Sequence, residues 1–153
     1  MKPTGSGYLE FDNVHFSWPN GVNVIDQLSF SIVKPGLWMI VGKNGSGKST
    51  LFRLISGLIQ PDSGKIHCSL RPSMVYQNPD HQLLMPTCKS ELMLNIPKTI
   101  PYHKLYDLIQ SALEKVDLGE MLDRPIHTLS GGEKQRLALA GAIVSNSNLL
   151  LLD

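Results

Sequence analysis

The chain has 153 residues, of which 42% are hydrophobic, and this is enough for one globular domain with a sizeable core. Fourteen Lys and Arg residues against 13 Asp and Glu give a formal net charge of +1, so no overall field would attract nucleic acid or an anionic membrane. No apolar run approaches the roughly 18 residues that span a bilayer, and the N-terminus lacks the apolar segment of a signal peptide. We therefore expect a domain that lies outside the membrane and contacts it only through a partner.

Strands are predicted first. Apolar and polar residues alternate in Tyr8–Asp12 and again in residues 22–33, with Pro19-Asn20-Gly21 between them as a turn, and this pattern predicts a small antiparallel unit. The continuous apolar run Leu37–Val41 predicts a strand that is buried on both faces. Residues 73–76 and 149–152 predict two further short strands.

Helices are predicted in the rest of the chain. Apolar residues at positions 51, 54, 55 and 58 have helical spacing, and Gly57 and Pro61 are stop signals. A second apolar stripe runs from Leu105 to Val116, and a third helix is expected to begin at Ser130. Between them, prolines interrupt residues 77–101, although residues 89–95 could form a short helix. His81 and His127 have no partner pattern and are interpreted as loop residues, and Cys68 and Cys88 as reduced thiols of a cytosolic protein.

One motif predicts phosphate binding. Residues 42–49 match G-x-x-x-x-G-K-[ST] between a predicted buried strand and a predicted helix. Glycines let successive backbone N–H groups curl around a phosphate, and the helix N-terminus adds roughly half a positive charge. Lys48 would reach the β- and γ-phosphates, and the Ser49 hydroxyl would coordinate Mg²⁺. A glycine-rich turn without a ligand is the alternative. The predicted nucleotide-binding residues are Gly42, Lys43, Asn44, Gly45, Ser46, Gly47, Lys48, Ser49 and Thr50.

A second helix start is also unusual. Ser130 and Glu133 have the spacing of a capping box, which would explain both residues without a ligand. It does not explain Gly131 and Gly132, because each glycine costs roughly 1 kcal/mol of helix propensity relative to alanine. Bare backbone at a helix N-terminus suits the close approach of an anion, so these residues form a second candidate phosphate site.

Three motifs in this order resemble those of the ABC-type ATPases. Residues 129–136, Leu-Ser-Gly-Gly-Glu-Lys-Gln-Arg, resemble the ABC signature, the P-loop precedes them, and four leucines and Asp153 after them resemble a Walker B strand. Residues 75–83 resemble the Q-loop region of the ATPase subunits of energy-coupling-factor and cobalt/nickel-type importers. The resemblance implies an α/β P-loop fold of ABC type over residues 1–153, with an N-terminal antiparallel β unit, a helical subdomain at about 80–135, and the C-terminal part of the core sheet absent.

The resemblance also implies site residues. Gln77 would contact Mg²⁺ and the attacking water, although a polar strand cap is the alternative for this residue. Trp18 matches an aromatic position that stacks on adenine and is more often Tyr in the family; packing is its alternative. Asp153 would hold Mg²⁺ through water. Ser130 and Gly132 would act in trans, because two subunits of this family sandwich ATP head to tail. Lys48, Gln77, Ser130 and Gly132 are thus the predicted catalytic residues, and Ser49, Gln77 and Asp153 the predicted metal ligands.

The implied function is that of the ATP-hydrolysing subunit of a membrane importer, for cobalt or a vitamin, at the cytoplasmic face. Its partners would be transmembrane subunits and a second ATP-binding subunit in a homo- or heterodimer. Family members continue past the position of Asp153 with a catalytic glutamate, a switch histidine and a strand that enters the core sheet between the P-loop strand and the Walker B strand. Without that strand, we expect residues 37–41 and 149–152 to have no neighbour in the sheet and to leave unpaired edges. We therefore expect this chain alone to be poorly soluble and to hydrolyse ATP near background. The alternatives are a nucleotide-binding module without turnover and a soluble non-transport ABC ATPase.

Overall fold

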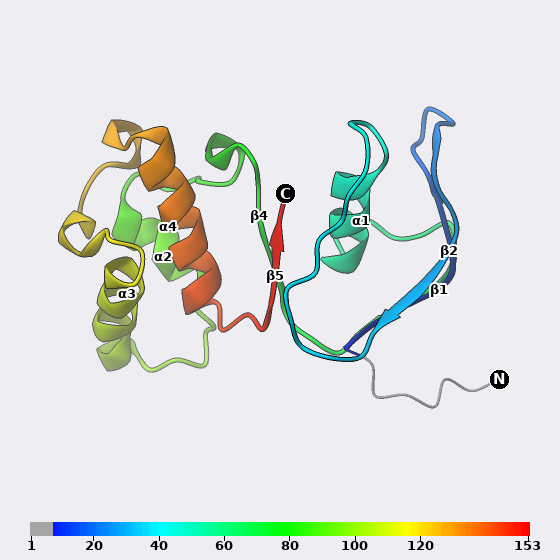
Figure 1. Ribbon diagram of the computed structural model, residues 1–153. Coiled ribbons are helices and arrows are strands. Elements are labelled where there is room, and N and C mark those ends of the chain that lie inside the picture. Colours follow the sequence, from blue (N-terminus) through cyan, green and yellow to red (C-terminus); the bar gives the residue numbers. More distant parts are fainter. Residues whose placement is uncertain (1–7) are drawn as a thin grey trace. The chain divides into compact units, whose positions relative to one another are not determined.

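The structure is a computed structural model that describes residues 8–153 (Figure 1). These residues form two compact units, one that ends at Pro72 and one that covers Ser73–Asp153. Each unit is described by itself below. None of the helices within residues 8–153 is long and apolar enough to cross a membrane.

The first unit is built on a three-stranded antiparallel sheet. Strand β1 (Leu9–Ser17) lies between β2 (Asn23–Ile32) and β3 (Ser63–Cys68). Phe11 of β1 pairs with Phe30 of β2, and their rings stack at a centroid distance of 4.8 Å. The predicted antiparallel unit is confirmed, but β3 was not predicted. Its sequence, Ser-Gly-Lys-Ile-His-Cys, contains a single aliphatic residue, so apolar alternation could not reveal it.

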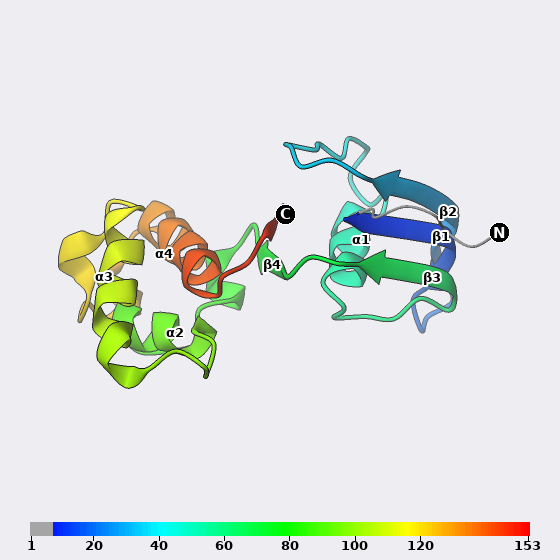
Figure 2. The same ribbon diagram turned by 90° about the horizontal axis from the view of Figure 1, so that it is seen from below.

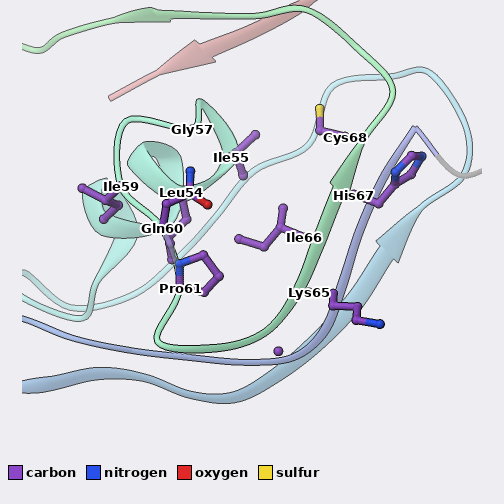
Figure 3. A pocket seen from close by; sticks show the side chains of 11 residues that line it. Leu54, Ile55, Gly57, Ile59, Gln60, Pro61, Lys65, Ile66, His67 and Cys68 are labelled. Carbon is purple, nitrogen blue, oxygen red and sulfur yellow. The ribbon is translucent and has the colours of Figure 1, made fainter.

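Helix α1 (Lys48–Ile55) lies against one face of this sheet (Figure 2). It buries Leu51, Leu54 and Ile55, three of the four residues whose spacing predicted it. The helix ends at Ile55, with Ser56 as its C-cap, and Gly57 follows with φ of 73°. A cavity of about 550 Å³ lies between the C-terminal end of α1 and β3 (Figure 3). None of the predicted site residues lines this cavity.

The predicted buried strand at residues 37–41 is not present. These residues belong to no strand of the described chain, and Leu37, Met39 and Val41 are 95%, 81% and 85% exposed. A run that is apolar on both faces becomes a buried strand only where neighbouring strands satisfy its N–H and C=O groups and other layers cover its side chains. Neither described sheet includes this segment. Both the expected strand and its expected burial are therefore wrong for this structure.

The second unit contains the helices α2 (Cys88–Asn95), α3 (Leu105–Glu114) and α4 (Gly131–Val144), joined by short 3₁₀ turns (Figure 1). Leu92, Leu113 and Leu137, one from each helix, are fully buried at the centre of its core. The three predicted helices at these places are therefore confirmed. Cys88 is buried beside them, and this burial raises the pKa of its thiol. Both Cys68 and Cys88 are free, as expected.

Two short strands form a second sheet. Strand β4 (Pro72–Val75) pairs with β5 (Leu149–Leu152), and the backbone N–H of Asp153 donates to the carbonyl of Val75 at 3.1 Å. Val75 also packs on Ala138 and Ala142 of α4. Both strands were predicted. The expectation that residues 149–152 would have no neighbouring strand is wrong, because β4 is that neighbour.

Candidate functional site

The loop before α1 curls back on itself. The N–H of Ser46 donates to the carbonyl of Lys43 at 3.1 Å, and the Lys48 ammonium donates to the carbonyls of Gly42 and Lys43 at 3.0 and 2.9 Å. An ammonium has three donors, so two of these bonds hold the loop closed while a third donor remains for a ligand. The side chain that the motif predicts to contact phosphate is thereby held against the loop backbone at residues 42 and 43.

Helix α1 begins without any side-chain cap. Its N-cap is Gly47, which has no side chain to accept from the first-turn N–H groups, and no acidic residue lies in the first turn. The first N–H groups of a helix have no intrahelical acceptor, and the helix dipole makes this end positive. The helix start and the Lys48 ammonium therefore fit a polyphosphate, and Ser49 is exposed beside them. Thr50, by contrast, is buried.

Gly47 is required by its surroundings as well as by its backbone. Its φ is 92°, and a Cβ at this position would lie 2.7 Å from a methyl carbon of Val24 at the start of β2. A side chain would therefore meet both a strained backbone and a steric clash. Val24 was not predicted as a site residue, because nothing in the motif reveals which strand packs against the loop.

Trp18 lies in the same unit, directly after β1. Its ring meets Phe16 edge-on at 5.1 Å between centroids, and the guanidinium carbon of Arg53 lies 5.7 Å from the Trp18 ring centroid. Trp18 is partly exposed. These contacts fix the ring through packing and a cation–π contact, and they bring Arg53 of α1 beside it. Arg53 was not predicted; stacking of Trp18 on adenine stays a prediction.

In the second unit, two predicted Mg²⁺ ligands follow strands that end side by side. Gln77 comes two residues after the end of β4, and Asp153 one residue after the end of β5. Because the N–H of Asp153 donates to the carbonyl of Val75, the chain segments that carry the two residues leave the sheet at the same end. Amide and carboxylate oxygens are ligands that Mg²⁺ accepts, so the donor set fits the predicted ion.

The start of α4 has the predicted capping box. The Ser130 hydroxyl accepts from the N–H of Glu133 at 3.3 Å, and the Glu133 carboxylate accepts from the N–H of Ser130 at 2.6 Å. The hydrogen bond from the Ser130 backbone, followed by that from its hydroxyl, lowers the pKa of Glu133. A Cβ on Gly131 would meet no atom within 4 Å, and one on Gly132 only Arg136 Nη1 at 3.9 Å. Packing inside the unit therefore does not require these two glycines.

The loop that follows Gln77 has further polar contacts that the sequence did not predict. Glu91 is only 5% exposed, and its carboxylate accepts from the N–H groups of Leu84 and Met85 at 2.9 and 2.8 Å. Asp80 forms an ion pair with Lys134.

His81 and His127 lie in short 3₁₀ turns, and neither belongs to a group of metal-ligating side chains in residues 8–153.

The chain is similar to known proteins over most of its length. The family model described as ABC transporter matches residues 25–153. The chain belongs to the ABC transporter family. It is 38% identical to ABC transporter I family member 10 of Arabidopsis thaliana, over the whole of this chain and 62% of that protein. It is 33% identical to the energy-coupling factor transporter ATP-binding protein EcfA of Malacoplasma penetrans, over 95% of this chain and 55% of that one.

A solved structure shows the same ABC fold. The structure of cbiO1 from Clostridium perfringens, described as part of the ABC transporter complex cbiONQ, superposes with a TM-score of 0.82 at 26% identity. The match covers 96% of this chain and 65% of cbiO1. The α/β P-loop fold of ABC type is therefore confirmed. The chain spans less than two thirds of the length of these relatives.

Proposed function

We propose that this chain is the nucleotide-binding part of an ATP-hydrolysing subunit of an ABC importer of the energy-coupling-factor or cobalt type. The observation that supports this most strongly is the closed P-loop, in which Lys48 bridges two carbonyls beside an uncapped helix start. The relatives named above support the importer class. The partners would be transmembrane subunits and a second ATP-binding subunit, with cobalt or a vitamin as cargo and the cytoplasmic face as location.

In this proposal each unit supplies its own group of residues. The curled loop and the start of α1 bind the phosphates, Ser49 helps to hold Mg²⁺, and Trp18 receives the adenine ring. Gln77 and Asp153 supply oxygen ligands toward Mg²⁺ and its water. Ser130 and Gly132 at the start of α4 contact the ATP held by the second subunit. Bound Mg²⁺ would neutralise the charge that develops on the transferred phosphoryl group.

A test of nucleotide binding follows from the contacts of Lys48. We expect Lys48→Ala to weaken Mg·ATP binding by about tenfold or more, because it removes both the ammonium and the contacts that keep the loop closed. Titration with a fluorescent ATP analogue measures the change. Lys65→Ala is the matched control, since it removes the same charge from an exposed position on β3 of the same unit. Equal affinities of the Lys48→Ala variant and the unchanged chain would contradict the proposed site.

Binding without turnover is the second candidate function. The observation that favours it is the exposed segment 37–41, because the P-loop that follows it is not attached to a strand in this structure. Catalysis depends on holding its groups in place, so a loop anchored on one side only is suited to binding more than to turnover. Phosphate release, measured on chains shown to bind nucleotide, separates the two functions.

A further inference from the structure

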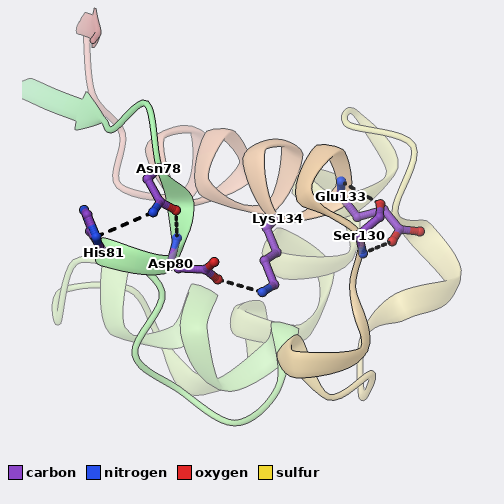
Figure 4. Close-up of polar contacts among 6 residues, drawn as sticks. All are labelled: Asn78, Asp80, His81, Ser130, Glu133 and Lys134. Carbon is purple, nitrogen blue, oxygen red and sulfur yellow. Dashed lines mark hydrogen bonds and ion pairs between the residues drawn. The ribbon is translucent and has the colours of Figure 1, made fainter.

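The five residues after Gln77, Asn-Pro-Asp-His-Gln, have no place in the nucleotide chemistry proposed above. Asn78 and Gln82 close the loop on itself, because Asn78 accepts from the N–H of Asp80 at 3.0 Å and Gln82 accepts from the N–H of Tyr76 at 3.1 Å. Asp80 is left with its carboxylate directed away from the loop, toward α4 (Figure 4).

Two side chains near the start of α4 contact this loop. The Lys134 ammonium lies 2.6 Å from the Asp80 carboxylate, although 54 residues separate the two in sequence. The side-chain amide of Gln135 donates to the carbonyl of Gln77 itself at 3.5 Å. The Lys134 side chain is 18% exposed and that of Asp80 is 61% exposed. The lysine is therefore packed along its length, and its charged end is the part that reaches the loop.

Lys134 and Gln135 lie next to the residues at the start of α4 that are proposed to contact a second nucleotide. Lys134 and Gln135 come directly after Glu133, which caps the helix together with Ser130. The first turns of α4 thus present Ser130 and Gly132 at the helix start and hold the Gln77 loop through the next two residues. Because both groups lie within the first turns of one 14-residue helix, a shift of the Gln77 loop can pass to the helix start.

We propose that Lys134 and Gln135 are positioning residues that fix the Gln77 loop to α4. Through them, a displacement of Gln77 at the nucleotide bound by its own subunit would reach Ser130 and Gly132, which face the nucleotide bound by the second subunit. The functional part of this inference rests on the proposed function, but the contacts of Lys134 and Gln135 with the loop exist without nucleotide.

A second lysine of the same unit serves as a control. Lys115 is exposed on the segment after α3 and forms no ion pair among the described residues.

Hydrogen exchange of the whole chain without nucleotide tests the attachment. We expect Lys134→Gln to speed exchange of the peptide that covers residues 77–83 by about twofold to fivefold, the range that corresponds to loss of one partly exposed ion pair. Lys134→Arg should exchange as slowly as the unchanged chain, because arginine keeps the positive charge opposite Asp80. The exchanged pair Asp80→Lys with Lys134→Asp should also restore it. Lys115→Gln should leave exchange of this peptide unchanged.

Two results would overturn the inference: exchange in Lys134→Gln equal to that in the unchanged chain, or failure of both charge-restoring variants to recover protection. Loss of protection throughout α4 and the core peptides in Lys134→Gln would also count against it, since that pattern indicates general unfolding. Nucleotide affinity is measured separately on the same variants. A chain that fails to bind ATP refutes the proposed function, while the exchange result still decides whether Lys134 holds the loop.

Discussion

Gly132 and Gly64 show that the same residue type can be present for opposite reasons. A Cβ on Gly132 would have room, whereas a Cβ on Gly64 would lie 2.3 Å from the carbonyl oxygen of Asn13, and Gly64 has φ of 85°. The fold therefore requires the second glycine and not the first. If Gly132 serves a ligand of another subunit, its lack of a side chain has a cost in helix stability that nothing in its own unit offsets.

This difference can be measured. We expect Gly132→Ala to leave the free energy of unfolding unchanged or to raise it by up to about 1 kcal/mol, because alanine is the better helix former. Gly64→Ala, the matched change, should lower it by about 2 kcal/mol or more through backbone strain and collision. Denaturant titration of both variants checks the contrast. Clear destabilisation by Gly132→Ala would show an internal role for this glycine.

At the scale of elements, local patterns predicted those parts of the molecule whose structure is determined by neighbours in sequence. Helices α1, α3 and α4 and the hairpin of β1 and β2 follow from apolar periodicity, turn residues and caps. The pairing of Asp80 with Lys134 could not be predicted, since nothing local links positions 54 residues apart. Residues 37–41 illustrate the other limit. An apolar run predicts a buried strand only if neighbouring strands are present to pair with it, and no strand of the described sheets pairs with this segment.

The loop before α1 and the capping box of α4 could be located from the sequence because each is a local arrangement with a fixed spacing, while phosphate binding by that loop stays a prediction. The contacts of Val24 with Gly47 and of Arg53 with Trp18 arise from packing between elements. No motif marks Val24 or Arg53, so these parts of the candidate site came only from the structure.

The capping box of α4 gives a pH prediction. The pKa of Glu133 in the folded chain is below its ordinary value of 4.5, so its contribution to stability is fully present above 4.5 and disappears as the pH falls through the lowered pKa. The melting temperature of the unchanged chain should therefore exceed that of Glu133→Gln at neutral pH, and the difference should shrink in acid. Thermal melts of both chains from roughly pH 3 to pH 7 check this. A difference that does not depend on pH would contradict it.

The whole molecule consists of two units, and each contains its own spectroscopic or chemical probe. Both tryptophans of the chain, Trp18 and Trp38, precede Pro72, while Cys88 is fully buried in the second unit. The burial that raises the pKa of the Cys88 thiol also keeps alkylating reagents away until that unit opens.

We expect the two units to unfold separately. In a Cys68→Ser background, Leu113→Ala should lower the denaturant midpoint for Cys88 alkylation, because truncating a fully buried leucine costs about 2–5 kcal/mol. The midpoint for tryptophan fluorescence should not move. Phe11→Ala, in the core of the first unit, should do the reverse. Midpoints that shift together in both variants would show a single cooperative molecule.

The pairing of β4 with β5 has a consequence for the order of assembly during synthesis. These strands lie at the two extremes of the second unit, and all three of its helices come between them. On the ribosome, the helices can form and begin to pack before residues 149–152 emerge, and the sheet can form only after that. Closing so long a loop has an entropic cost that an early hairpin such as β1 and β2 avoids. The end of the sheet at which Gln77 and Asp153 lie is therefore completed only after all three helices of the unit have been made.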